Sequence, residues 1–342
     1  MLPLLWIQLI AAAILILIAS KYLVTSSDTI AIKIGLGHTF VGIVLLATAT
    51  SLPELATGIS SITLANAPDL AAGAAFGSNI VNLLIIAIAD IIWRKGPMLA
   101  SISRAPVIVA ILGIVIIFIA SISTAIHHWT NLLDNWYVSP LSIVLVFFFI
   151  VATYIVYQID KKEAKLDDTK NTNESVKSKL DNETKRAFLF YMISAICIIG
   201  ASIWLSEIGD RLADALNWEQ SFVGTQFLAI STSLPELATT VAALRLGNPE
   251  MAVANLLGSN LFNMGFILFA DELAVTGSSL WANISFSHVI TGLTAILMTL
   301  IIVSALLIRQ NHPKGFSSRW INIESSSLLI IYIIASIGIF YL

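Results

Sequence analysis

Ten long apolar stretches occupy most of the chain and leave short polar segments between them. They lie near residues 3–31, 38–65, 68–92, 104–124, 137–158, 187–207, 219–245, 248–270, 283–308 and 322–341. Most of them reach the roughly 20 residues with which a helix crosses a bilayer. Only 11% of the residues are charged, whereas a soluble domain carries about a quarter. The sequence therefore predicts an all-α integral membrane protein with ten transmembrane helices.

The basic residues are distributed very unevenly among the loops. The loops after the odd-numbered spans, with the flanking helix ends, hold 17 of the 18 Lys and Arg residues, and only Arg211 falls elsewhere. Basic loops stay in the cytoplasm, so we expect both termini outside and the polar stretch 160–186 inside as a cytoplasmic linker. The protein is expected to be multi-pass and to lie in the cell membrane.

One segment of the sequence occurs twice. Residues 39–62, TFVGIVLLATATSLPELATGISSI, align without a gap to residues 221–244, SFVGTQFLAISTSLPELATTVAAL, with 13 identities in 24 positions. After the loss of one residue in the next turn, residues 77–82 match residues 258–263, and Asp90 matches Asp271. The repeated unit is therefore about five spans long.

An odd number of spans turns the second copy upside down relative to the first. The sequence thus predicts two inverted five-helix repeats, at 1–159 and 187–342, joined by the linker 160–186. Inverted repeats are typical of secondary transporters, whose binding site lies near the midplane between the copies.

Each copy carries one glutamate in the middle of a span. Glu54 and Glu236 both follow the tetrapeptide Thr-Ser-Leu-Pro. A carboxylate at that depth costs about 2.5–3.5 kcal/mol on insertion scales, so acids in such places are usually functional. The preceding prolines, Pro53 and Pro235, lack an N–H group and break the helix, which frees backbone carbonyls beside the acid.

Small polar residues accompany each glutamate at helical spacing. Thr50 with Ser51, and Thr232 with Ser233, precede the two acids, and Ala47 and Ala229 share their helix face. In the following spans the residues Ser78, Asn82, Ser259 and Asn263 repeat the pattern at i and i+4. Interhelical hydrogen bonding is the ordinary role of such side chains, and we use the repetition to assign them to the site instead.

Together these groups form an all-oxygen cage without Cys or His. Such a cage suits hard cations, and Ca²⁺ takes 6–8 oxygens, whereas soft transition metals are poorly served. Two glutamates balance the charge of one Ca²⁺, and two or three Na⁺ could use the same oxygens in its absence. The site is therefore suited to ion exchange.

The two TSLPELAT segments, each followed by a GSN-x-x-N segment, resemble the sodium/calcium exchanger branch of the cation/calcium antiporter superfamily. The resemblance implies Ca²⁺ between Glu54 and Glu236, helped by the carbonyls of Thr50 and Thr232. It also implies flanking Na⁺ sites that use Ala47 with Ser78 and Ala229 with Ser259, and it implies that spans one and six slide against the other helices. Exchangers of this branch commonly carry an aspartate where this chain has Asn263.

Two other functions remain open at this point. A proton-coupled Ca²⁺ antiporter would load H⁺ on the glutamates, and the lack of an acid at Asn263 would then be no handicap. An intramembrane enzyme could use the two glutamates as acid and base, although the sequence shows no nucleophile–base pair near them. We expect the lipid bilayer, Ca²⁺ and Na⁺, with H⁺ as an alternative, as the partners, no cofactor and no nucleic acid; the oligomeric state stays open.

Overall fold

Every regular element in the described part of the chain is a helix. The computed structural model describes residues 2–34, 47–93, 96, 98–103, 105–130, 136–168, 182–311 and 322–341. The elements, in chain order, are α1 (Leu2–Ile34), α3 (Ala47–Thr50), α4 (Leu52–Thr63), α5 (Pro68–Ile92), η2 (Met98–Ser101), α6 (Ala105–Trp129), α7 (Pro140–Asp168), α8 (Asn182–Leu216), α9 (Gln220–Val223), η3 (Gly224–Leu228), α10 (Ala229–Thr232), α11 (Leu234–Arg245), α12 (Pro249–Phe262), η4 (Asn263–Ile267), α13 (Leu268–Ala274), η5 (Leu280–Ala282), α14 (Ser287–Asn311) and α15 (Ile323–Phe340).

The described helices account for most of the expected spans. Eight are long and apolar enough to cross a membrane, and the segment from α9 to α11 provides a ninth with a bend of 40°. The expected span at 38–65 is described from residue 47 onward, as α3 and α4, and its first part lies outside the described residues. The all-helical membrane fold is confirmed, while the number ten stays a prediction.

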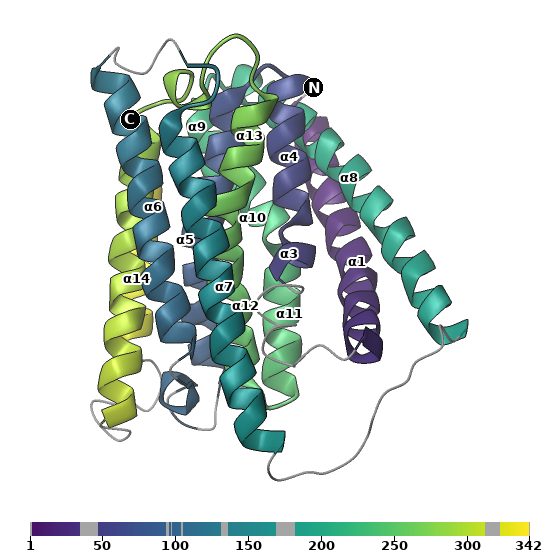
Figure 1. Cartoon of the computed structure of the whole chain (residues 1–342). Helices are drawn as coiled ribbons and strands as arrows, with labels where there is room; N and C mark the ends of the chain where they lie inside the picture. The colour runs from purple at the N-terminus through teal and green to yellow at the C-terminus, as the bar shows by residue number, and fades with distance from the viewer. Residues whose placement is uncertain are drawn as a thin grey trace.

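The ends of the chain and the middle of the chain lie on opposite faces. Figure 1 shows both termini at one end of the bundle, and the last turn of α7 with the first turn of α8 at the other end. This parity agrees with two five-span halves. Helix α7 continues to Asp168 and α8 begins at Asn182, so helix extends into both sides of the expected linker, and residues 169–181 lie outside the described part.

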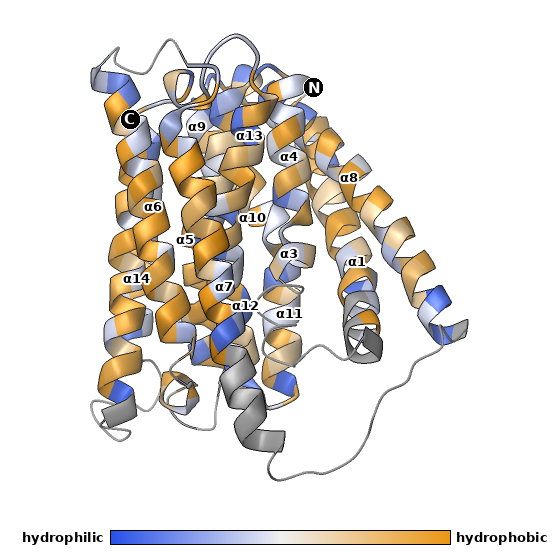
Figure 2. Ribbon diagram, viewed as in Figure 1, coloured by the Kyte–Doolittle hydropathy of each residue, from blue (hydrophilic) through white to orange (hydrophobic). Residues whose placement is uncertain are grey.

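Large apolar side chains cover the outside of the bundle. Exposed examples are Ile143, Phe147 and Ile150 on α7, and Ile330 and Ile334 on α15. Figure 2 shows apolar residues along the outer helices and hydrophilic residues mainly at the helix ends and around the breaks between the short helices. This distribution is the reverse of a soluble protein's and fits a surface that contacts lipid tails.

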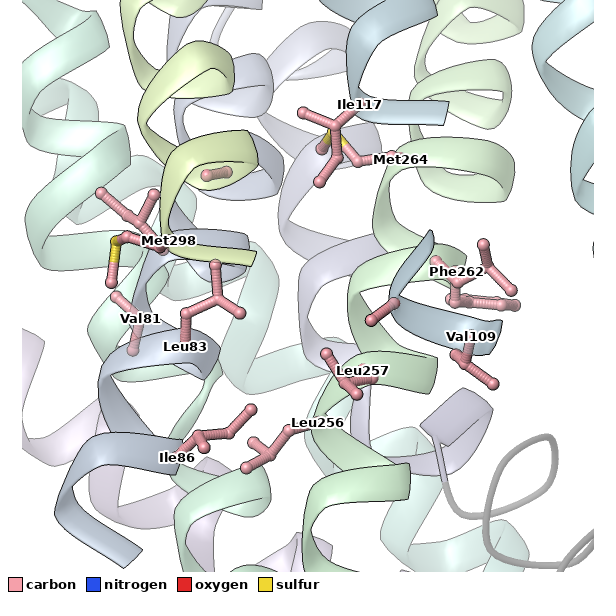
Figure 3. Close-up of a cluster of buried hydrophobic side chains, with 14 of the residues drawn as sticks. Val81, Leu83, Ile86, Val109, Ile117, Leu256, Leu257, Phe262, Met264 and Met298 are labelled. Carbon is pink, nitrogen blue, oxygen red and sulfur yellow. The ribbon is translucent and has the colours of Figure 1, made fainter. Parts of the chain in front are cut away.

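The interior is held by an apolar cluster between α5, α6, α12 and α14. Leu83, Ile86, Ile117, Leu256 and Met298 belong to it and are almost completely buried. Figure 3 shows Met298 near Leu83, Ile86 near Leu256, and Ile117 beside Met264. The cluster joins a helix pair from each half of the chain, so the two halves share one core.

The two halves contact each other through hydrogen bonds at equivalent positions of the repeat. Asp69, at the start of α5, accepts a hydrogen bond from the backbone N–H of Ser285, just before α14, at 2.6 Å. Glu250, at the start of α12, accepts one from the hydroxyl of Ser103, just before α6. Each acid on the third span of one copy thus binds the residue before the fourth span of the other, as inverted repeats require.

A second mirrored pair lies at the far ends of these spans. Asp90 accepts a hydrogen bond from the N–H of Met98, eight residues later, at 3.0 Å. Glu272 accepts one from the N–H of Leu280, also eight residues later, at 2.6 Å. Each of these acids also accepts a bond from the residue just before the last span of the other copy, α15 or α7. In the repeat, Glu272 is therefore the residue equivalent to Asp90.

This pairing corrects the sequence alignment of Asp90 with Asp271. Helix α5 runs for 25 residues without interruption, whereas α12, η4 and α13 together span 26 residues. The extra residue is taken up by η4, a π-helical turn, and such turns insert one residue into an α-helix. The register therefore shifts by one residue after Asn263, and Asp271 has no acidic counterpart in the first copy.

Helices α1 and α8 form a pair at one side of the bundle (Figure 1). Their shared seam contains Leu9, Ile16, Leu205 and Leu212, all buried. The pair also contacts α4 and α11, the helices that carry the glutamates. The sliding of these two helices stays a prediction, because the structure describes one arrangement.

A glycine lets α5 pack directly on the bent span of the second copy. A Cβ atom at Gly77 would lie 2.5 Å from the carbonyl oxygen of Thr225 and 2.8 Å from Cβ of Ala229. The backbone cannot yield as a flexible side chain would, so any side chain here must separate the two elements. Gly77 is therefore a point of direct contact between α5 and the second copy.

Gly77→Ala is expected to destabilise the purified protein by about 1–3 kcal/mol through overpacking, seen as a lower thermal midpoint in detergent. Gly113→Ala is the matched control, because no atom lies within 4 Å of a Cβ added there in α6. In a helix interior that change is neutral or favourable by about 0.5–1 kcal/mol. Equal midpoints for the two variants would contradict the packing described for Gly77.

Candidate cation-binding site

The two glutamates lie at the first turns of two half-helices. Glu54 is the third residue of α4 and Glu236 the third residue of α11. A single residue, Ser51 or Ser233, separates each half-helix from the short helix before it, and Pro53 or Pro235 follows. Because a helix amino terminus carries partial positive charge, it favours an anionic side chain in this position. The prolines break both spans as predicted, and the breaks position the acids.

Both carboxylates are withdrawn from solvent. Glu54 is 1% exposed and Glu236 is 0% exposed. No Lys, Arg or His is hydrogen-bonded to either acid among the described residues. Buried anions without a basic partner need another compensation, and the surrounding groups supply a large part of it.

Four serine hydroxyls donate to the two carboxylates in a symmetric pattern. In each case the acceptor is the Oε1 atom, and the Oε2 atom of each acid takes no part in these bonds. The donors to Glu54 are Ser78 at 3.2 Å and Ser233 at 3.3 Å, and the donors to Glu236 are Ser259 at 3.3 Å and Ser51 at 3.5 Å.

The serines at the helix breaks are the connection between the two copies. Ser51 and Ser233 occupy the cap positions of α4 and α11, but neither makes a side-chain cap bond to its own helix. Each hydroxyl instead reaches the glutamate of the opposite copy. Since each serine lies three residues before its own glutamate, the two acids must lie close together.

The threonines complete the ring of hydroxyls. Thr50 lies 3.4 Å from Ser259, and Thr232 lies 3.5 Å from Ser78, in both cases between side-chain oxygens. All four residues are fully buried. The structure therefore brings eight of the twelve predicted site residues into one cluster, which consists of Glu54, Glu236, Thr50, Thr232, Ser51, Ser233, Ser78 and Ser259.

Ala47 and Ala229 are buried next to this cluster, but their carbonyl oxygens are occupied. The carbonyl of Ala47 accepts the N–H of Ser51 at 2.9 Å and the hydroxyl of Thr50 at 3.2 Å. The carbonyl of Ala229 accepts the equivalent bonds at 3.0 Å and 3.3 Å. A carbonyl oxygen has two lone pairs, so a Na⁺ ion at either position would first have to displace the threonine hydroxyl.

The two predicted asparagines lie one helical turn beyond the serines. Asn82 donates a hydrogen bond to Oδ1 of Asn260 at 2.9 Å, and Asn260 donates to the carbonyl of Asn79 at 3.3 Å. Asn263 stands at the start of the π-turn η4 and is fully buried. Neither amide atom of Asn263 has a hydrogen-bond partner among the described residues.

Several oxygens of this cluster and of the two asparagines one turn beyond it have no hydrogen-bond partner in the described part of the chain. They are Oε2 of Glu54, Oε2 of Glu236, Oδ1 of Asn82 and Oδ1 of Asn263. Buried polar atoms are nearly always bonded in native proteins, so a group of free oxygens marks a place for a ligand with positive charge. No cluster of three or more His, Cys, Asp or Glu exists among the described residues, so hydroxyls and amides must supply most of the oxygens.

Asn79 and Asn260 bridge α5 and α12 across the repeat and were not predicted as site residues. Their identical place in the two GSN-x-x-N segments was the signal for them. Gln226 in the π-turn η3 was not predicted either, and its Oε1 accepts hydrogen bonds from Tyr332 and Ser336 of α15, both at 3.1 Å. No sequence pattern marks that residue.

Inverted repeats with two buried carboxylates between them are typical of a secondary transporter in a membrane. Residues 4–158 and 186–341 match the family described as "Sodium/calcium exchanger protein". The chain belongs to this family, and its function at that level is cation/calcium antiport.

Related proteins cover most of the chain. The inner membrane protein YrbG of Escherichia coli is 26% identical over 280 residues, 79% of each chain. The sodium/calcium exchanger MaX1 of Methanosarcina acetivorans is 26% identical over 272 residues, which are 73% of this chain and 77% of that protein. A solved structure of the sodium-calcium exchanger NCX_Mj matches 98% of each chain with a TM-score of 0.61 and 21% identity. The structure of native YfkE matches with a TM-score of 0.67 at 17% identity, over 98% of this chain and 92% of that one.

Ca²⁺ is expected to stabilise the purified protein against heat, because a ligand of the folded state alone adds about 2.7 kcal/mol at 100 times its Kd. The rise of the thermal midpoint with Ca²⁺ should disappear in Glu54→Gln and in Glu236→Gln, and chelation should reverse it in the unchanged protein.

Glu207→Gln is the control for that measurement. Glu207 is an exposed acid on α8 that pairs with Arg211 at 2.5 Å, so its replacement should leave the Ca²⁺ response intact. A Ca²⁺ response that survives in both Glu54→Gln and Glu236→Gln would place the binding site elsewhere.

Proposed function

We propose that this protein exchanges Ca²⁺ for Na⁺ at one site centred on Glu54 and Glu236. The observation that carries the proposal is the pair of buried carboxylates, each with one free oxygen, that are joined by hydroxyls from both copies of the repeat. The two negative charges match one Ca²⁺. Without a cation they would repel each other in a buried setting.

The ligands in this proposal come from both copies in equal number. The carboxylates of Glu54 and Glu236 hold Ca²⁺ together with the carbonyls of Thr50 and Thr232. Na⁺ uses the same carboxylates with flanking oxygens from both copies. These flanking ligands are Ala47, Ala229, Ser51, Ser233, Ser78, Ser259, Asn82 and Asn263.

The choice of Na⁺ as the counter-ion rests on the residues around the acids and on the relatives. Proton-coupled exchangers usually differ from Thr-Ser-Leu-Pro before the glutamate. One similar protein, MaX1, is named a sodium/calcium exchanger. Asn263 favours the second candidate, a proton-coupled Ca²⁺ antiporter, because it leaves the centre with two acids instead of three.

Transport in this proposal follows alternating access. The pair α1 and α8 slides over the bundle formed by the other helices and exposes the site to each side in turn. The halves 1–159 and 187–342 act as the two inverted units, with 160–186 in the cytoplasm and both termini outside. In the cell membrane an inward Na⁺ gradient would then drive Ca²⁺ out.

Proteoliposomes that contain the purified chain should accumulate Ca²⁺ when an outward Na⁺ gradient is imposed. A pH gradient of equal size should have little effect, and Glu54→Gln or Glu236→Gln should reduce uptake to that of empty vesicles. Uptake is measured with ⁴⁵Ca²⁺ or an enclosed Ca²⁺ indicator. If Ca²⁺ follows the pH gradient alone, the proton-coupled antiporter replaces this proposal.

Asn263→Asp is expected to change the number of charges moved per cycle, because the added carboxylate keeps the shape of the side chain and would bind one further Na⁺ in the Na⁺-loaded state. Ca²⁺ uptake by this variant should depend more strongly on an imposed membrane potential than uptake by the unchanged protein. Asn248→Asp provides the control, since Asn248 caps α12 at the helix start and away from the cage. Identical voltage dependence in Asn263→Asp and the unchanged protein would exclude Asn263 from the ion path.

A further inference from the structure

One buried acid lies outside the cage and has no bonds of its own. Asp271 on α13 is 0% exposed, and neither of its carboxylate oxygens has a hydrogen-bond partner among the described residues. Its neighbour Glu272 takes the structural role at this end of the span, with bonds from Ser139, Ser279 and Leu280. Asp271 is therefore not needed to cap or connect these helices.

The carboxylate of Asp271 lies against the bare backbone of α4. A Cβ atom added to Gly58 would lie 2.5 Å from Oδ1 and 2.7 Å from Oδ2 of Asp271. Gly58 follows Glu54 by one helical turn, so both residues lie on the same side of α4. Figure 1 shows α13 beside α4 at the end of the bundle that holds the termini. Asp271 thus stands one turn from the cage, toward that face.

The other copy has no such acid. With the register shift at η4, the positions equivalent to Asp271 and Gly58 are Ala89 and Thr240, both buried. The corresponding contact in the other copy, between the helices that carry Ala89 and Thr240, therefore forms without a carboxylate. The acid at position 271 is therefore a feature of one end of the transport path rather than a requirement of the repeat.

Among the described side chains of the elements that pack on α13, none offsets a negative charge on Asp271. The elements that pack most closely on α13 are α4, α5, α7, η4 and η5. Their titratable side chains, where side chains are described, are Glu54 on α4, Asp69 and Asp90 on α5, and Tyr154 and Tyr157 on α7. Asp69 and Asp90 hold their own partners, and Glu54 adds a like charge.

A bound metal ion does not fit this position. One carboxylate pressed against Gly58 offers far fewer than the 6–8 oxygens that Ca²⁺ requires, and the described residues hold no cluster of three metal-binding side chains. A proton neutralises the carboxylate and needs no further ligand. Isolated buried carboxylates are ordinarily neutralised in this way.

A cavity comes within one helical turn of Asp271. A cavity of about 340 Å³ lies past the ends of α4 and α13, and its lining includes Ile62, Asn66, Ala274 and Thr276. Ile62 follows Gly58 by one turn, and Ala274 follows Asp271 by one turn. A small movement of α4 away from α13 would therefore expose the carboxyl group to this cavity, where it can release or take up a proton.

We propose that Asp271 is a proton-binding site, and that its protonated side chain lets α4 lie on α13 and closes this end of the path to Glu54. Release of the proton into the cavity leaves a carboxylate that cannot stay buried there, so this end opens. The inference rests on the proposed transport function, to which it adds a proton at a position separate from the cage.

Infrared spectroscopy of the purified full-length chain tests the protonation directly. The experiment uses Glu54→Gln/Glu236→Gln as background, which removes the acids of the cage and makes the result independent of transport. We expect a neutral carboxylic acid band that titrates with pH and is lost in Glu54→Gln/Glu236→Gln/Asp271→Asn. The control is Glu54→Gln/Glu236→Gln/Asp214→Asn, in which the same band should remain because Asp214 is an exposed acid on α8. A spectrum unchanged by Asp271→Asn would overturn the proposal, whatever ion the cage transports.

A pair of variants tests the contact with α4. Gly58→Ala should slow Ca²⁺ exchange by about tenfold, because the added methyl group overlaps the carboxyl group, and Gly58→Ala/Asp271→Ala should restore most of the rate. Gly113→Ala, which has open space around it, should leave the rate unchanged. If Gly58→Ala has the rate of the unchanged protein, or if the double variant is as slow as Gly58→Ala, then Asp271 does not close this path.

Discussion

The structure depends on keeping two carboxylates inside a bilayer. Glu54 and Glu236 are buried without a basic partner, and in hydrocarbon such a pair would be strongly unfavourable. The chain surrounds them with serine and threonine hydroxyls and places each at the positive end of a half-helix. These groups offset part of the cost and leave one oxygen of each acid free. In the proposed function a cation supplies the rest, which would link the stability of the centre to the transported ion.

The inverted repeat is the means by which these groups meet. A single copy offers one acid, one broken helix and a cap serine whose hydroxyl does not bond its own helix. When the second copy is turned over and packed against the first, Ser51 faces Glu236 and Ser233 faces Glu54. The same inversion pairs Asp69 with Ser285 and places Glu272 opposite the start of α7. Catalytic chemistry is not required for such an arrangement, and the family to which the chain belongs is one of exchangers.

The two copies are not equivalent, and their differences lie along the proposed transport path. The π-turn η4 begins at Asn263 and adds a residue to the eighth span. That residue moves Glu272 into the position of Asp90 and leaves Asp271 against Gly58. Turns of this type are common at functional sites. Here one π-turn begins at Asn263 and also turns Asp271 toward Gly58. The first copy has no acid at the equivalent position.

The sequence by itself determined the membrane class, the approximate places of the described spans, the inversion and the residues that meet around Glu54 and Glu236. It did not give the ends of α7 and α8, which extend well beyond the expected spans. Apolar length, the parity of basic loops and a repeated motif are local or countable properties, so no coordinates are needed to interpret them. The tertiary structure alone decided which hydroxyl donates to which glutamate, that the carbonyls of Ala47 and Ala229 are occupied, and that Asp90 corresponds to Glu272. The hydroxyl donors depend on contacts between residues about 180 positions apart, and the occupied carbonyls depend on the local geometry of the two helix breaks. The correspondence of Asp90 and Glu272 depends on one inserted residue within a helix, and alignment places such an insertion in a turn as readily as in a span.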